Sequence, residues 1–128
     1  MNLKTIFKRL ILLDLSLIIL IIVAVFFETK EVADFNMYFE NDYSNALLII
    51  FGIGLLIYLI NLFLLYKFKS IGKQMYLFIY IIGFVIVLLA GPNASDPWMY
   101  VLDGIEMSVA GALLVLLYFT PIKKEFDK

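Results

Sequence analysis

The sequence predicts an all-α integral membrane protein with four transmembrane helices in a compact bundle. The chain has 128 residues, 64% of them apolar, and a mean hydropathy of +1.02, which is far above the range of soluble domains. Four long apolar runs account for most of the chain and leave no room for a separate soluble domain. We therefore expect one domain over residues 1–128, with spans at about 6–27, 45–66, 72–90 and 97–119.

The cations lie almost entirely on one side of the predicted membrane. Three lie at or before the start of the first span, three at the turn between the second and third, and three after the fourth, whereas Lys30 is alone between the first and second. Short loops rich in Lys and Arg stay on the cytoplasmic side of a membrane. The pattern predicts a multi-pass protein of the cytoplasmic (inner) membrane with both termini in the cytoplasm.

The apolar run of the first span follows directly after a short basic segment, residues 1–9. Its apolar run, Leu10–Phe27, is longer than the apolar part of a typical signal peptide, and no small-residue cleavage motif follows it, so we expect an uncleaved signal anchor. Asp14 lies about 6 Å along the helix axis from Leu10, close enough to the helix end for partial hydration. Asn61 falls at a similar depth in the second span, which predicts a hydrogen bond between Asp14 and Asn61.

Residues 28–44 connect the first two spans and carry five acidic side chains against one Lys. Val32, Phe35, Phe39 and Tyr43 recur at helical spacing, which is typical of a helix lying on the membrane surface. A solvated loop with scattered aromatic residues fits the same pattern, and both interpretations stay open.

The fourth span contains the acids that the sequence places deepest in the membrane. Asp96 and Pro97 suit a helix start, but only 13 residues, 107–119, then lack a charge, and they cover about 20 Å of a hydrocarbon core roughly 30 Å thick. A spanning helix must therefore include Asp103 and Glu106, which share a helix face. Because no Lys or Arg occurs at this depth in the sequence, the pair is a candidate proton or cation site.

Small residues in three spans are candidates for helix packing. Gly104, Ser108 and Ala112 recur every four residues, a spacing that lets a second helix approach closely. Three further glycines fall near the predicted level of Glu106, where glycine gives either close helix contact or space for water: Gly52, Gly54 and Gly83.

The composition excludes several classes of function. The chain has no Cys and no His, which excludes disulfides, thiol nucleophiles and imidazole metal sites. It has no phosphate-binding glycine loop and no basic aromatic groove for nucleic acid. We therefore expect no enzymatic activity, no catalytic residue, no cofactor, no metal site and no nucleic-acid partner.

The architecture and one acid resemble the small multidrug resistance transporters. Those proteins have four helices, about this length, and an acid in the first helix, where this chain has Asp14. The surrounding Asp-Leu-Ser lacks the small residues and the glycine that follow the acid in that family, and the strong charge bias argues against dual topology. The resemblance covers architecture and one residue, and it does not establish membership.

Two functions from different classes follow from these patterns. The first is a non-enzymatic accessory or scaffold subunit in the lipid bilayer, whose helices pack in a homo-oligomer or a larger membrane complex. The alternative is a small oligomeric carrier or channel, coupled to protons or cations, that uses Asp103 and Glu106.

Overall fold

Helices make up almost all of the computed structural model, which describes residues 2–38, 44–89 and 94–127. The predicted all-α class is confirmed over these residues. In chain order the helices are α1 (Leu3–Val25), α2 (Lys30–Tyr38), α3 (Ser44–Tyr66), α4 (Ser70–Leu89), α5 (Pro97–Phe119) and the short 3₁₀ helix η1 (Pro121–Glu125).

Three of the described helices are long and apolar enough to cross a membrane by themselves. These are α3, over its segment Leu48–Tyr66, and α4 and α5 over their whole lengths. α1 reaches the same criterion only together with α2, from which it is bent by 85°. The difference arises from charge, because α1 opens with three cations and also contains Asp14. The structure thus supports a membrane-embedded protein with three or four spans.

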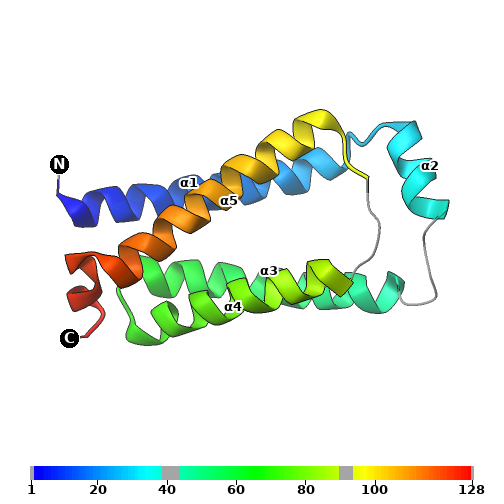
Figure 1. Cartoon of the computed structure of the whole chain (residues 1–128). Helices are drawn as coiled ribbons and strands as arrows, with labels where there is room; N and C mark the ends of the chain where they lie inside the picture. Colours follow the sequence, from blue (N-terminus) through cyan, green and yellow to red (C-terminus); the bar gives the residue numbers. More distant parts are fainter. Residues whose placement is uncertain (1, 39–43, 90–93, 128) are drawn as a thin grey trace.

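The long helices form two pairs, α1 with α5 and α3 with α4 (Figure 1). Both chain termini lie at one end of the molecule, which we call the terminal end, and α2 lies at the other, which we call the α2 end. The two pairs come together at the terminal end and diverge toward the α2 end. Most of the buried core therefore lies in the terminal half.

An aromatic cluster closes the terminal end. Phe126, just after η1, is almost fully buried, and its ring lies 5.8 Å from that of Phe7 and 5.3 Å from that of Phe68. Phe68 adopts a positive φ of 54°, which ends α3 and turns its ring toward the other two. An ion pair between Lys4 and Glu125, at 2.7 Å, joins the two ends of the chain on the outside of this cluster.

The turn from α3 to α4 depends on Gly72. A Cβ atom at this position would lie 2.9 Å from Cβ of Leu64 and 3.1 Å from the backbone nitrogen of Leu65, so only glycine permits this approach without a shift. Asn61 is fully buried beside it; in the amide orientation that satisfies both its atoms, it donates to the carbonyl of Gly72 at 2.8 Å and accepts from the backbone N–H of Tyr76 at 3.1 Å. Asn61 therefore fixes the start of α4 against α3.

Side-chain hydrogen bonds hold α1, α2 and α5 together at the α2 end. Both carboxylate oxygens of Asp96 accept from Thr29, one from its backbone N–H at 3.0 Å and one from its hydroxyl at 2.8 Å. Asn36 of α2 exchanges two hydrogen bonds with the backbone of Ala94. Asp96 does occupy the N-cap position of α5, but its side chain makes no capping hydrogen bond because Thr29 uses both oxygens.

The helical interpretation of the segment after the first span is confirmed over Lys30–Tyr38. Two of the four residues whose spacing suggested it, Phe39 and Tyr43, lie outside the described residues.

Candidate functional site

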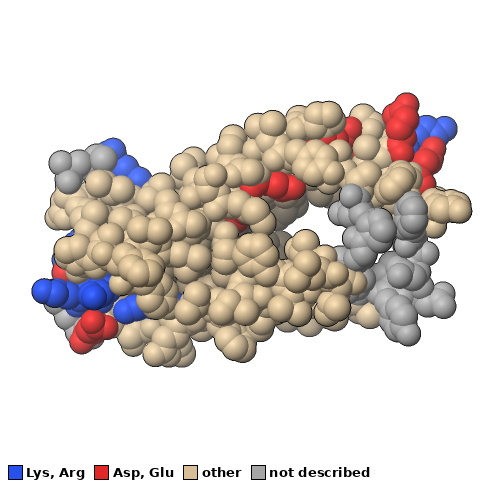
Figure 2. Space-filling view, in the orientation of Figure 1, with Lys and Arg blue, Asp and Glu red and all other residues tan. Residues whose placement is uncertain are grey.

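A cavity of about 610 Å³ lies between the two helix pairs. We call it the cleft. Its walls come from Ile18 of α1, from residues 50–58 of α3, from residues 78–87 of α4, and from Glu106 and Met107 of α5. In the space-filling view an opening separates the two pairs, and acidic side chains lie beside it (Figure 2). The cleft exists because α3 and α4 diverge from α1 and α5 at this level.

Glu106 is the one residue with a carboxyl group among the described residues that line the cleft. Along α5 it precedes Ala110, Leu113 and Leu117 on the same face, and these three side chains are fully buried in the core. One face of α5 therefore packs in the core over the terminal half and borders the cleft at Glu106, where the helix pairs diverge. No Lys or Arg is among the residues that line the cleft.

Asp103 is not among the cleft-lining residues, although it lies one turn from Glu106 on α5. Its side chain is half-buried, and the two carboxyl groups are close enough to interact electrostatically. The structure thus places the members of the predicted pair in different surroundings, with Glu106 in the cleft and Asp103 outside it.

Asp14 lies beneath the floor of the cleft and is fully buried, so the expected partial hydration is wrong. It stands in the buried stripe of α1 between Ile11 and Ile18. The hydroxyl of Tyr58 donates to Oδ2 of Asp14 at 2.8 Å, whereas Oδ1 has no hydrogen-bond partner among the described residues. Tyr58 also lines the cleft, so its side chain contacts both the buried Asp14 and the cavity.

The hydrogen bond predicted between Asp14 and Asn61 does not form in this structure. Both side chains are fully buried, as a shared polar contact would require, but each makes its hydrogen bonds elsewhere. Tyr58 is long enough to reach Asp14 from α3, which leaves the shorter Asn61 free to bind the first turn of α4.

A second tyrosine extends this polar cluster. The hydroxyl of Tyr76, a fully buried residue of α4, lies 3.5 Å from the hydroxyl of Tyr58 and 3.5 Å from the carbonyl oxygen of Ala110. The cluster therefore links all four long helices around Asp14. Neither tyrosine was predicted from the sequence to belong to a site; the signal that could have found them is that a hydroxyl buried in a span requires a polar partner.

The candidate packing glycines have no close neighbour from another helix among the described residues. A Cβ atom at Gly52, Gly54, Gly83 or Gly104 would meet no heavy atom within 4 Å. Gly54 and Gly83 instead line the cleft together with Glu106, whereas Gly52 is not among its lining residues. They provide space there, and the glycine that permits close helix contact is Gly72.

The stripe of Gly104, Ser108 and Ala112 lies on an exposed face of α5. The hydroxyl of Ser108 donates to the carbonyl of Gly104 within the same helix, at 2.8 Å. Within the described chain this face is therefore free of helix packing, and it remains available to lipid or to another protein.

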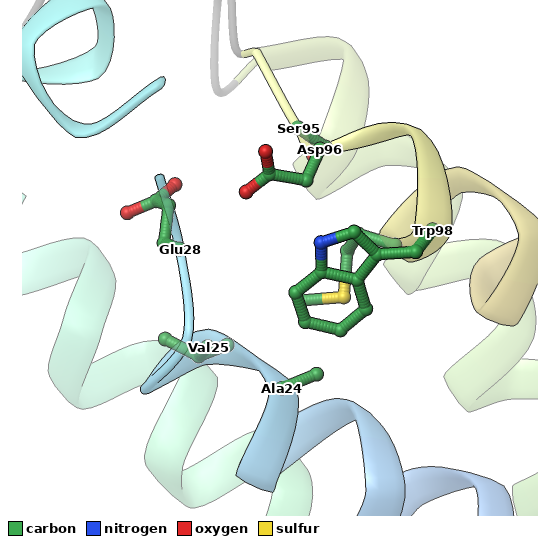
Figure 3. A pocket seen from close by; sticks show the side chains of 7 residues that line it. Ala24, Val25, Glu28, Ser95, Asp96 and Trp98 are labelled. Carbon is green, nitrogen blue, oxygen red and sulfur yellow. The ribbon is translucent and has the colours of Figure 1, made fainter. Parts of the chain in front are cut away.

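A much smaller pocket, of about 40 Å³, lies at the α2 end between α1 and α5 (Figure 3). Glu28 and Asp96 lie at its rim, and the indole ring of Trp98 lies between Asp96 and Ala24. Since Glu28 accepts from Asn36 and Asp96 accepts from Thr29, both carboxylates have structural partners. This pocket is part of the contact that holds α1, α2 and α5 together at the α2 end.

Comparison with known protein families, with curated proteins and with solved structures finds no match to this chain. The features of this chain that point to a function are therefore the cleft and the acids and tyrosines around it. The arrangement offers one carboxyl in an apolar cavity and a second carboxyl below it, joined to the cavity by a tyrosine hydroxyl.

Proposed function

We propose that this chain is a non-enzymatic protein of the cytoplasmic membrane that binds a proton or a cation at Glu106, as a small carrier or receptor. The observation that carries the proposal is the position of Glu106 in a cavity of about 610 Å³ whose other walls are almost entirely apolar. Cavities of this size accommodate small molecules, and a few polar groups in them orient the ligand. A carboxyl in hydrocarbon is costly unless it binds a proton or a positive charge.

The shape and chemistry of the cleft favour a ligand with an apolar body and a positively charged group. Aromatic and aliphatic side chains such as Phe51, Phe84 and Ile18 would contact the body. Glu106 would pair with the charge, because the residues lining the cleft include no competing cation. Proton release from Glu106 would then accompany cation binding.

For topology we propose four spans, with α1 as the first, α2 on the outer surface and both termini in the cytoplasm. Support comes from the nine of ten cations in segments that the four-span arrangement assigns to one side. Exposed apolar side chains on α2, such as Phe35 and Met37, suit a helix at the interface. Reporter fusions at the C-terminus and at residue 36 test this topology, and an external C-terminus would contradict it.

Labelling with dicyclohexylcarbodiimide tests the binding proposal. This apolar reagent partitions into membranes and modifies protonated carboxyl groups, and mass spectrometry of peptides locates the adduct. We expect modification of Glu106 in wild-type membranes, the same modification in the matched control Asp103→Asn, and its loss in Glu106→Gln. Dodecylamine should protect Glu106, whereas dodecanol, of the same length but uncharged, should protect much less. An unmodified Glu106, or equal protection by both compounds, would contradict the proposal.

An accessory or scaffold role is the second candidate, and the exposed stripe of Gly104, Ser108 and Ala112 favours it. A surface of small residues lets another helix approach closely in a membrane. Purification in mild detergent followed by native mass measurement tests this role. A stable complex with an unlike partner, lost in Gly104→Leu, would support it; a monomer unaffected by Gly104→Leu would contradict it.

A further inference from the structure

We propose that Asp14 is a second proton-binding site, and that Tyr58 is the route by which its proton exchanges with the cleft. This goes beyond the role of Glu106, since Asp14 does not line the cleft and needs no ligand there. Three observations carry it: the burial of Asp14, the absence of a cation in contact with its carboxyl group among the described residues, and the position of Tyr58 between Asp14 and the cleft.

Asp14 has the surroundings of a neutral acid. It is fully buried, and one of its oxygens has no hydrogen-bond partner among the described residues. An unpaired carboxylate in such a place carries a large desolvation cost, which binding a proton removes. Among the described residues, the titratable groups that face it are Tyr58 of α3, Tyr76 and Tyr80 of α4, and Glu106 of α5, none of which can carry a positive charge.

The cations of α1 do not compensate Asp14. Lys8 lies about 9 Å from it along the helix axis, and its Nζ lies over the ring of Tyr66, 4.6 Å from the ring centroid. The side chain of Arg9 is exposed. Toward the terminal end, buried apolar side chains such as Ile11, Leu65 and Leu117 separate Asp14 from the surface.

Tyr58 connects Asp14 to the cleft, on the side away from the terminal end. Its hydroxyl donates to Oδ2 of Asp14 at 2.8 Å, and its side chain lines the cleft. For proton uptake, the hydroxyl proton of Tyr58 passes to the carboxylate of Asp14, and a proton from water or from Glu106 in the cleft replaces it on the tyrosine oxygen. Release follows the reverse order, and Tyr58 is neutral before and after each transfer.

Infrared spectroscopy of the full-length protein in lipid, with isotope exchange, tests this proposal. Wild-type protein in mildly acidic buffer should show the carbonyl stretch of a protonated aspartic acid, identified by its shift when aspartate is labelled with ¹³C. The band should vanish in Asp14→Asn, which keeps an acceptor for Tyr58, and should persist in Glu106→Gln. In ²H₂O the band shifts as the proton exchanges, and in Tyr58→Phe this shift should be roughly tenfold slower or more. Tyr80→Phe, which also alters a hydroxyl at the cleft, should exchange at the wild-type rate.

Each measurement in this experiment has a result that would contradict one part of the proposal. If wild-type protein lacks a ¹³C-sensitive aspartic acid band, or if the band survives in Asp14→Asn, then Asp14 does not hold a proton. If Tyr58→Phe exchanges as fast as the wild type, Tyr58 is not the route. Failure of Glu106 to react with carbodiimide would leave the Asp14 band unaffected, so the two proposals fail separately.

Discussion

The hydroxyl of Tyr58 donates a hydrogen bond of 2.8 Å to Oδ2 of Asp14, and this contact joins α3 to α1 across 44 residues of sequence. It lies at the level where the packed half of the molecule gives way to the cleft, because Asp14 belongs to the core stripe of α1 and Tyr58 lines the cavity above it. The same pair therefore contributes to the stability of the bundle and to the chemistry of the cleft.

Replacing Tyr58 by Phe should destabilise the folded protein. The change removes the donor to Asp14 and leaves that buried carboxyl without a hydrogen bond among the described residues, which costs about 1–3 kcal/mol. Tyr80→Phe is the matched control, since no described hydrogen bond involves its hydroxyl, and it should change stability by less than about 0.5 kcal/mol. Thermal unfolding of both variants in the same detergent measures the difference, and equal melting temperatures would show that the Tyr58–Asp14 contact is not stabilising.

The stability of the wild-type protein should decrease as pH rises from mildly acidic to alkaline. If Asp14 and Glu106 hold protons in the folded protein, as proposed, the unfolded chain releases these protons, so folding binds protons and weakens when they become scarce. Asp14→Asn and Glu106→Gln should each flatten the dependence, and the double variant should flatten it most. Melting curves across this pH range provide the measurement. A slope unchanged by both substitutions would mean that neither acid is protonated in the folded state.

Gly72→Ala should destabilise the protein, because the new Cβ would lie 2.9 Å from Cβ of Leu64 at the α3–α4 turn. Crowding of this kind costs about 1–3 kcal/mol. Gly52→Ala is the control: nothing lies within 4 Å of that position in the middle of α3, and alanine should stabilise the helix there by roughly 0.5–1 kcal/mol. We expect a lower melting temperature for Gly72→Ala and a higher one for Gly52→Ala. An unchanged melting temperature of Gly72→Ala would show that the turn can widen without loss of stability.

Phe126→Ala should destabilise the terminal end by about 3–5 kcal/mol, since it removes a nearly fully buried ring from the cluster with Phe7 and Phe68. Lys4→Ala breaks the nearby ion pair with Glu125, but both side chains are partly exposed, so the expected loss is below about 1 kcal/mol. Chemical or thermal unfolding distinguishes the two. Similar losses would mean that the ion pair contributes as much to stability as the aromatic ring does, which would contradict this prediction.

Hydropathy alone predicted the long helices to within a few residues, because a run of apolar residues with few charges defines a span whatever its neighbours are. The face of α5 that continues from Glu106 to Leu117 was also predictable from helical spacing. These features depend on one helix at a time, so sequence order is sufficient for them.

The partners of the polar residues could not be predicted in the same way. Equal depth suggested Asn61 for Asp14, but the rotation of α3 and the length of the tyrosine side chain decide the contact in favour of Tyr58. The glycines of α3 and α4 were equally ambiguous: only the divergence of the helix pairs shows that Gly54 and Gly83 border open space while Gly72 makes the close contact. Such choices depend on the relative placement of helices, which a single sequence does not encode locally.

Because the helix pairs diverge, a small rotation of α3 at its packed end would produce a larger displacement at its far end. Leu62 of α3 is held in the packed half, whereas Leu48, 14 residues earlier, is exposed beyond the cleft. This arm is about 21 Å long, so a rotation of about 5° about the packed end would displace its tip by about 2 Å. A bulkier residue beside Phe126 is therefore expected to change the separation of the helix pairs at the cleft without contacting the cleft itself.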